Sequence, residues 1–251
     1  MNDLDQAYLA IDAYDDWMAL GRASYLRCAD LLAAATASDW EAPTACTGWT
    51  VRDLAGHLVG AMRSAASLRE TASQQRAVAK RVKETGEAEV DALTALQIAR
   101  AADLEPPEVV AELRRLVDPA IAGRQRLPRF VRRRVGFQVH LGAIDERWTL
   151  DRFLGQILTR DAWLHGVDLA DALGVDLALD ATDRAVVGDV AVEWAHRHGR
   201  PVDLSLTGPA GGRLVVGQGG DRLEVDAVEF CRIVSGRSSG DHPLLDQPVP
   251  F

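Results

Sequence analysis

The sequence predicts an α+β protein in which a helical domain over residues 1–177 is followed by a small α/β domain over residues 178–251. As far as Gly174, the clearest segments repeat their apolar residues every three or four positions, which is the helical period. After Gly174, short segments of alternating apolar and polar residues are separated by glycine-rich turns. The chain of 251 residues is 47% hydrophobic and 26% charged, so it can bury a substantial core.

Apolar periodicity and a capping signal predict the first two helices. The segment from Leu4 to about Ala35 has the helical period and contains no proline, so we expect one helix there. A loop containing proline and glycine follows. Thr50 then precedes Asp53 by three residues, which resembles a capping box. A second helix should therefore begin near Val51 and extend through Ala66 or beyond.

The middle of the chain carries weaker signals. The segment from Thr71 to Arg100 is compatible with a helix but is more polar. Prolines are predicted to break the following region into short helical pieces, the clearest being Glu108–Val117; they are Pro106, Pro107, Pro119 and Pro128. A strong helical pattern then begins at Thr149 and ends at Gly174. Its length indicates a central element.

The C-terminal part reads as a mixture of helices and strands. A helix is expected from about Thr182 to His198 and a last one from about Ala227 to Ser235. Three short strands are expected between them, at Val202–Leu206, Arg213–Val216 and Arg222–Val225. Together they form the predicted α/β domain.

The charge balance argues against nucleic acid and anionic membranes as partners. The formal net charge is -9 and the sequence pI is near 5.2, so the average surface repels phosphate groups. A local exception is the basic run Arg124–Arg134, which contains six arginines. This run is interpreted either as an anion contact or as a solvated charged face.

Cysteine usage and hydropathy indicate a cytoplasmic protein. The three cysteines, Cys28, Cys46 and Cys231, lie far apart and lack the spacing of a disulfide scaffold or a zinc knuckle. The N-terminus is acidic where a secretory signal would be basic. No run of about 18 apolar residues predicts a transmembrane helix.

Asp161, His165 and Asp168 form the first candidate site. Their spacings of four and three residues place them within a sector of about 60° on the helix predicted from Thr149. The same face carries leucine and isoleucine, so these polar groups should be buried and need partners. A divalent ion would satisfy Asp and His together. The alternative is a core network in which Asp161 and His165 pair with each other or with Arg160 or Arg147.

His57 is a third candidate ligand. It lies on the second predicted helix, at the flank of that helix's apolar stripe. Its neighbours Gly56, Gly60 and Ala61 are small, and small residues let another helix or a ligand approach closely. Taken alone, His57 fits a core or surface histidine better than a metal ligand. Cys46, just before this helix, is interpreted as a buried structural cysteine.

Two segments carry a resemblance to a known family. The string from Cys46 to Leu58 (CTGWTVRDLAGHL) resembles the N-terminal signature of the mycothiol-dependent maleylpyruvate isomerase family, whose Gly-Trp-Thr-Val-x-Asp-Leu-x-x-His stretch supplies the first metal histidine. The segment from Arg160 to Asp168 (RDAWLHGVD) is similar to that family's second metal segment. The ending, Phe230–Arg237 and Pro248–Phe251, is similar to uncharacterised actinobacterial members.

The resemblance implies a DinB-like four-helix bundle with an open three-ligand zinc site, and a C-terminal α/β domain similar to sterol-carrier folds. It assigns the metal ligands to His57, Asp161 and His165. Asp168 would orient a ligand or an arginine. Arg237 would be an anion contact for the cofactor. The better-known isomerase has glutamate where this chain has the shorter Asp161, so the choice of metal stays open.

The function expected from this resemblance is a metal-dependent thiol transferase or isomerase that uses mycothiol as its thiol cosubstrate. Three protein ligands leave a fourth position open, where a metal lowers the pKa of a bound thiol. The substrate would be a small electrophile. A hydrolase with metal-bound water and a non-catalytic small-molecule-binding protein are the alternatives. We expect a monomer or homodimer without nucleic-acid or membrane partners.

Overall fold

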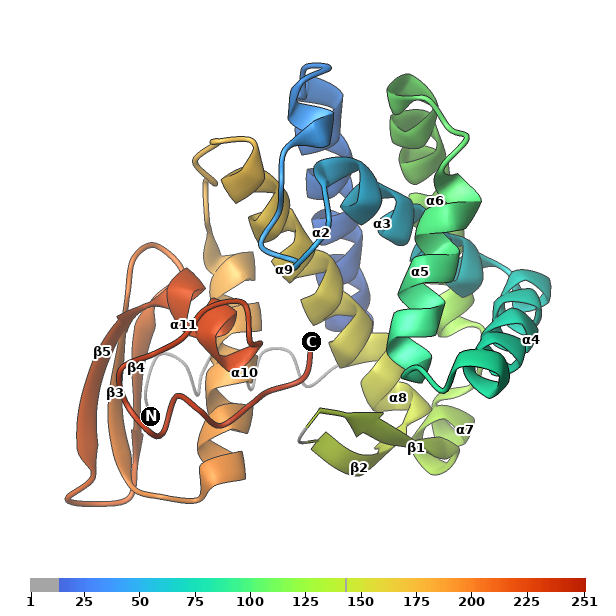
Figure 1. Cartoon of the computed structure of the whole chain (residues 1–251). Helices are drawn as coiled ribbons and strands as arrows, with labels where there is room; N and C mark the ends of the chain where they lie inside the picture. The colour runs from blue at the N-terminus through green and yellow to red at the C-terminus, as the bar shows by residue number, and fades with distance from the viewer. Residues whose placement is uncertain (1–13, 143) are drawn as a thin grey trace.

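The computed structural model describes residues 14–142 and 144–251. A helical part occupies one side of the molecule, and a smaller unit with a three-stranded sheet occupies the other (Figure 1). The predicted α+β class is confirmed. Among the described residues, no helix has the length and apolarity needed to cross a membrane.

Four helices form the bundle that the resemblance predicts. They are α2 (Tyr14–Ala34), α3 (Val51–Ala66), α6 (Pro106–Gln125) and α9 (Leu158–Ala172). Helix α3 packs on α6 and α9, and α2 packs on the same two helices. Their shared core includes Leu32, Leu54 and Leu113, and each such burial contributes roughly 1.5–3 kcal/mol. The first ten residues of the helix predicted from Leu4 lie outside the described residues.

The start of α3 matches the predicted capping signal. The Thr50 hydroxyl accepts a hydrogen bond from the Asp53 backbone N–H, and the Asp53 carboxylate accepts one from the Thr50 N–H. Two further helices, α4 (Leu68–Thr85) and α5 (Glu89–Ala101), then pack together against α3. The helix-compatible segment from Thr71 to Arg100 is therefore two helices, separated at Gly86.

The prediction that proline divides the middle into short helical pieces is wrong for α6, which is one helix of 20 residues. Pro106 lies in the first turn, where no backbone N–H donor is required. Pro119 lies inside the helix but on its exposed side. Buried residues on both sides of it, including Val117 and Ala120, pack into the bundle. This packing outweighs the roughly 3 kcal/mol that an internal proline costs.

A short helix and a β-hairpin follow α6. Helix α7 spans Arg129–Arg134, and the antiparallel strands β1 (Gly136–Leu141) and β2 (Ile144–Thr149) pair across the turn. The sequence analysis did not predict these strands. Within the basic run, Arg124 and Arg132 are buried and donate to the backbone carbonyls of Leu154 and Leu127, respectively. The run is therefore partly a structural element.

The helical pattern from Thr149 is interrupted once before α9. Thr149 caps the short α8 (Leu150–Arg152), and a π-helical turn, η2 (Phe153–Ile157), leads into α9. A π-turn displaces backbone carbonyls from the regular α-helical pattern. Arg124 binds the carbonyls of Leu154 and Gly155 in this turn, so its buried guanidinium stabilises the interruption.

The C-terminal unit contains the elements that the sequence predicts. Helix α10 (Ala181–His198) precedes β3 (Val202–Thr207), β4 (Gly212–Val216) and β5 (Asp221–Asp226), and α11 (Ala227–Val234) follows. The strand order is β4-β3-β5, with β3 antiparallel to β4 and parallel to β5.

One apolar core joins this unit to the bundle. It contains Trp17 of α2, Trp163 of α9 and Trp194 of α10. Because this core continues from the bundle into the sheet, the C-terminal unit packs against α9. The domain boundary near residue 177 stays a prediction.

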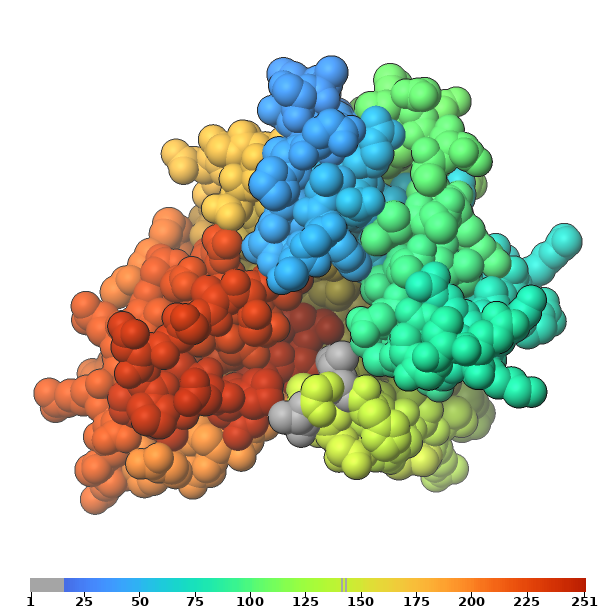
Figure 2. Space-filling view, viewed as in Figure 1, coloured from blue at the N-terminus to red at the C-terminus, as the bar shows by residue number. Residues whose placement is uncertain are grey.

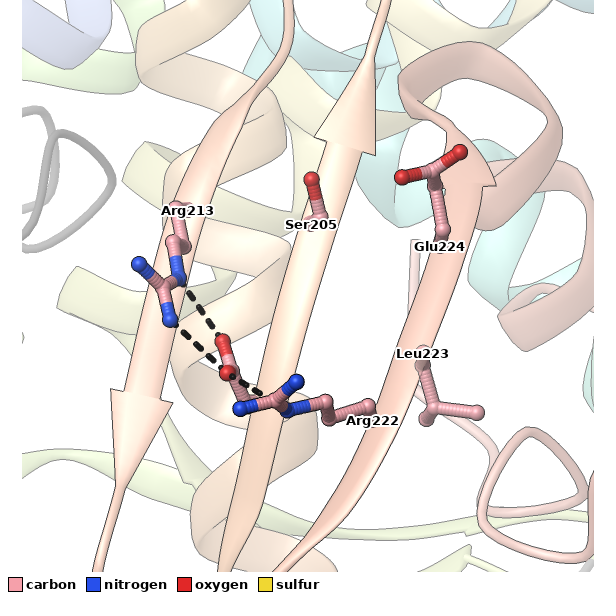
Figure 3. Close-up of a pocket in the computed structure, with 6 residues that line it drawn as sticks. Ser205, Arg213, Arg222, Leu223 and Glu224 are labelled. Atoms are coloured by element: carbon pink, nitrogen blue, oxygen red, sulfur yellow. Dashed lines mark hydrogen bonds and ion pairs between the residues drawn. The ribbon is translucent and has the colours of Figure 1, made fainter.

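The solvent face of the sheet forms an open, polar depression (Figure 3). Asp203 on β3 lies between Arg213 and Arg222 and makes two hydrogen bonds of 2.8 Å with Arg213. The charges on this face neutralise one another, and none of the candidate residues predicted from the sequence lies there.

Candidate metal centre

Helices α3 and α9 bring the three predicted ligands together. Asp161 and His165 lie one turn apart on α9, and Nε2 of His165 is 3.2 Å from Oδ1 of Asp161. His57 projects from α3, with its Nε2 3.9 Å from Oδ2 of Asp161. The two imidazole rings meet edge to face, with centroids 5.1 Å apart. One donor atom from each side chain lies within 4.8 Å of the others.

These distances suit a divalent ion. Donor atoms around tetrahedral zinc, at 2.0–2.1 Å from the metal, are about 3.3 Å from each other. The pair formed by Asp161 and His165 already has this separation, and His57 is only slightly farther away. A small closure of α3 toward α9 would complete the triangle. The donor set, two imidazoles and one carboxylate, is one that zinc accepts.

The cluster is buried on one side and open on the other. His57 and His165 are buried, whereas the Asp161 side chain remains 27% exposed. Trp49, in the loop before α3, packs near both rings, with its centroid 5.3 Å from His57 and 6.4 Å from His165. Figure 2 shows a hollow between this loop, α5 and the C-terminal segment. The Asp161 carboxylate is therefore partly exposed to solvent.

Each histidine is held at its other ring nitrogen. Nδ1 of His57 lies 2.8 Å from Oε1 of Gln97 on α5. Nδ1 of His165 lies 3.1 Å from Oδ2 of Asp168, one turn farther along α9. Asp168 is fully buried, and Nε of Arg237 donates to both of its oxygens at 2.9 Å. Such outer partners orient metal-binding histidines in known sites.

The charges of the cluster reinforce one another. Burial alone would raise the pKa of Asp161, but the adjacent His165 and His57 hold it well below its usual range. Burial alone would lower the pKa of His165, but Asp161 and Asp168 hold it well above its usual range. For Asp168, burial is outweighed by His165 and Arg237, which lower its pKa. In the absence of a metal the cluster therefore favours a cation, which is here the proton on His165.

A known family model covers most of the helical bundle. Residues 22–170 match the model of the mycothiol maleylpyruvate isomerase N-terminal domain. The chain belongs to this family. The matched residues include α3 and α9 and therefore all three candidate ligands.

Solved structures similar to this member of the family share its fold. A mycothiol-dependent maleylpyruvate isomerase and a histidine-to-alanine mutant of it each superpose with a TM-score of 0.57 at 18% identity. In each case the similarity covers 95% of this chain and 97% of the other. At this identity the similarity establishes the fold alone. A search of curated proteins finds no match.

The alternative to a metal was that Asp161 and His165 pair with each other or with an arginine. In this family member neither of the two candidate arginines pairs with them. Arg160 points away from Asp161 and pairs with Asp189 and Glu193. Arg147 is exposed on β2. The pair of Asp161 with His165 is present, and it is compatible both with a core network and with a metal centre.

The sequence predicted Cys46 to be a buried structural cysteine, but it is only half-buried and its thiol lies beside the cluster. Sγ of Cys46 is 3.5 Å from Oδ2 of Asp168 and 4.0 Å from Nδ1 of His165. These three residues form a second possible ligand group, which would use the opposite nitrogen of His165. Arg237 occupies both oxygens of Asp168, so this carboxylate is committed elsewhere. No spacing along the sequence could link Cys46 with α9.

Gln97 was also missed, although one signal pointed to it. The small residues around His57 were expected to let another element approach closely. A Cβ atom at Gly60 would lie 2.4 Å from Cβ of Gln97, so α5 does lie directly against this glycine. The sequence could not say which helix would approach or that it would carry an amide.

Proposed function

We propose that this chain is a metal-dependent, mycothiol-using thiol transferase or isomerase that acts on a small electrophilic substrate. The observation that carries the proposal is the convergence of His57, Asp161 and His165 from two helices. Gln97 and Asp168 contact Nδ1 of the two rings, which leaves Nε2 of each ring directed at Asp161. Membership of the family and the names of the two solved relatives support mycothiol as the thiol.

In this proposal the three side chains hold one divalent ion, zinc being the first candidate. A bound zinc ion would supply Lewis acidity, lowering the pKa of a thiol in the open position so that it reacts at neutral pH. Asp168 keeps the His165 ring oriented, and Arg237 keeps Asp168 ionised. Trp49 forms an apolar wall that limits the access of water to one side of the cluster.

Arg237 was expected from the sequence to contact an anionic group of the cofactor. Its Nε is engaged with Asp168, and its side chain is 15% exposed. We therefore propose that the main role of Arg237 is to bind and orient the Asp168 carboxylate. A cytoplasmic location, a monomeric or dimeric state and the absence of nucleic-acid or membrane partners remain part of the proposal.

Metal content tests the site directly. Protein purified without added metal should contain close to one equivalent of a divalent ion, measured by elemental analysis. The His165→Ala variant should lose it, whereas the exposed-histidine variant His196→Ala should retain it. A wild-type protein that contains no metal and takes up no zinc would overturn the metal centre.

Thiol dependence tests the chemistry. With mycothiol and a panel of small electrophiles that includes maleylpyruvate, turnover should require both the thiol and the metal. Turnover that needs the metal but no thiol would instead favour the hydrolase. Retention of a small molecule without any turnover would favour the binding protein.

A further inference from the structure

We propose that Gln97 and Gln74 are positioning residues that fix the ring tautomer of His57, so that its Nε2 lone pair faces Asp161. This inference rests on the proposed metal centre. It assigns a role to α4 and α5, which supply no ligand themselves. A series of hydrogen bonds runs from the Gly60 carbonyl of α3 through Gln74 and Gln97 back to His57 on the same helix.

The series begins at two groups that only accept hydrogen bonds. Nε2 of Gln74 donates to the carbonyl of Gly60 at 2.9 Å and to Oε1 of Glu70 at 3.1 Å. A backbone carbonyl has no proton to give. Burial alone would raise the pKa of Glu70, but the bonds from Gln74 and Arg100 lower it, so Glu70 is a carboxylate at neutral pH. The amide group of Gln74 can therefore be oriented in only one way.

This orientation propagates to the histidine. With its NH₂ group committed, Gln74 presents Oε1 to Nε2 of Gln97, at 3.0 Å. Gln97 must then turn its own Oε1 toward Nδ1 of His57, at 2.8 Å. An amide oxygen only accepts, so Nδ1 must carry the proton. In the neutral ring this leaves the lone pair on Nε2, which faces Asp161.

Burial makes the alternative orientation costly. Gln74 is 1% exposed and Gln97 is 3% exposed, so water cannot replace a lost partner. Rotating either amide would set two donors or two acceptors against each other. Each buried polar group left unsatisfied costs about 1–3 kcal/mol. All hydrogen bonds in the series from Gly60 to His57 therefore keep one donor-to-acceptor direction.

The second histidine has the same arrangement through a different group. Asp168 accepts from Nδ1 of His165, so Nε2 of that ring also faces Asp161. The two outer partners, an amide and a carboxylate, thus direct Nε2 of both rings to one point. Two Nε2 atoms and a carboxylate converging there favour one cation, a proton on His165 in the metal-free protein or the proposed divalent ion, which accounts for burying two glutamines at this place.

The tautomer can be read without any metal. In metal-free protein labelled with ¹⁵N-histidine, at a pH well above the usual histidine pKa, Nδ1 of His57 should give a protonated nitrogen signal. Gln97→Leu and Gln74→Leu should both produce a mixture of tautomers. Gln75→Leu, an exposed glutamine on the same helix as Gln74, should leave the signal unchanged. A proton found on Nε2 in the wild type, or an unchanged signal in both buried variants, would overturn the proposal.

Metal affinity provides the second readout. Competition with a chelator should show that Gln97→Leu binds zinc roughly 10–100-fold more weakly, as expected for loss of an outer partner. Gln97→Glu keeps an acceptor on His57 and should retain more affinity than Gln97→Leu. Gln97→Leu that stays folded and binds zinc like the wild type would contradict the role. If the wild type shows the expected tautomer but binds no zinc, the proposed metal function fails while the tautomer assignment stands.

Discussion

Nε2 of His57 lies 3.9 Å from Oδ2 of Asp161, although the two residues belong to α3 and α9, the second and fourth helices of the bundle. Oδ1 of Asp161 also pairs with Nε2 of His165 at 3.2 Å, so one carboxylate joins both imidazoles. The charge of this carboxylate is what makes the cluster attractive to a divalent cation. Changing that charge without changing the shape of the side chain is therefore the sharpest single test of the site.

The first prediction concerns Asp161→Asn. The amide preserves the volume but removes the negative charge and one acceptor, so zinc affinity should fall by more than the roughly 10–100-fold expected for an outer partner. Chelator competition measures the loss. The matched control is Asp176→Asn, at an exposed position beyond α9. Equal zinc affinity in Asp161→Asn and wild type would remove Asp161 from the ligand set.

The second prediction concerns Arg237, whose Nε binds both oxygens of the fully buried Asp168. Removing one partner of a buried ion pair leaves an uncompensated charge. Arg237→Leu should therefore lower the free energy of unfolding by roughly 3 kcal/mol, as measured by urea denaturation of the metal-free protein. The double variant with Asp168→Asn should recover part of this loss. Unchanged stability combined with a raised KM for the thiol would instead support direct cofactor contact.

The third prediction compares two glycines on α3. A Cβ atom at Gly60 would lie 2.4 Å from Cβ of Gln97, whereas one at Gly56 would lie 3.4 Å from Cβ of Ala101. Gly60→Ala should destabilise the protein by about 1–3 kcal/mol because α5 must move. Gly56→Ala should be neutral or stabilising, since alanine favours the helix by up to about 1 kcal/mol. Thermal unfolding measures both, and equal effects would show that α5 is not tightly packed at Gly60.

The fourth prediction concerns pH and Glu193 on α10. Burial alone would raise its pKa, but Arg160, Arg152 and Arg197 lower it from 4.5 to about 2. A carboxyl group whose pKa is lowered on folding stabilises the protein above its ordinary pKa, and this contribution is lost as the pH falls toward the folded value. The contribution at neutral pH is on the order of 3 kcal/mol.

Glu193→Gln should therefore be less stable at neutral pH, and its stability should fall less steeply than that of the wild type between pH 4.5 and about 2. Urea denaturation across this range measures the difference. Glu89→Gln, at an exposed position on α5, is the control. Parallel pH profiles for Glu193→Gln and wild type would show that folding does not lower the pKa of Glu193.

Local signals accounted for much of the fold. The capping box at Thr50 and Asp53, the apolar period of α9 and the glycine turns between β3, β4 and β5 depend on neighbouring residues, and each was readable from the sequence. The ligand candidates Asp161 and His165 share a helix face because of their spacing alone. His57 was linked to them by its motif, since no local rule relates α3 to α9.

Remote packing decided what the sequence could not. Pro119 continues α6 because buried neighbours on both sides hold the helix, although proline alone predicts a break. The β1–β2 hairpin was not predicted at all. Cys46 contacts His165, and Gln97 contacts His57, only because segments far apart in the sequence pack together.

The sequence by itself therefore determined the class of the fold, most of its elements and the identity of the three candidate ligands. Tertiary structure decided how His57 is oriented, because the proton position on its ring depends on groups from α4 and α5. Hydrogen bonds act over about 3 Å, and only the folded chain brings such distant residues within that range.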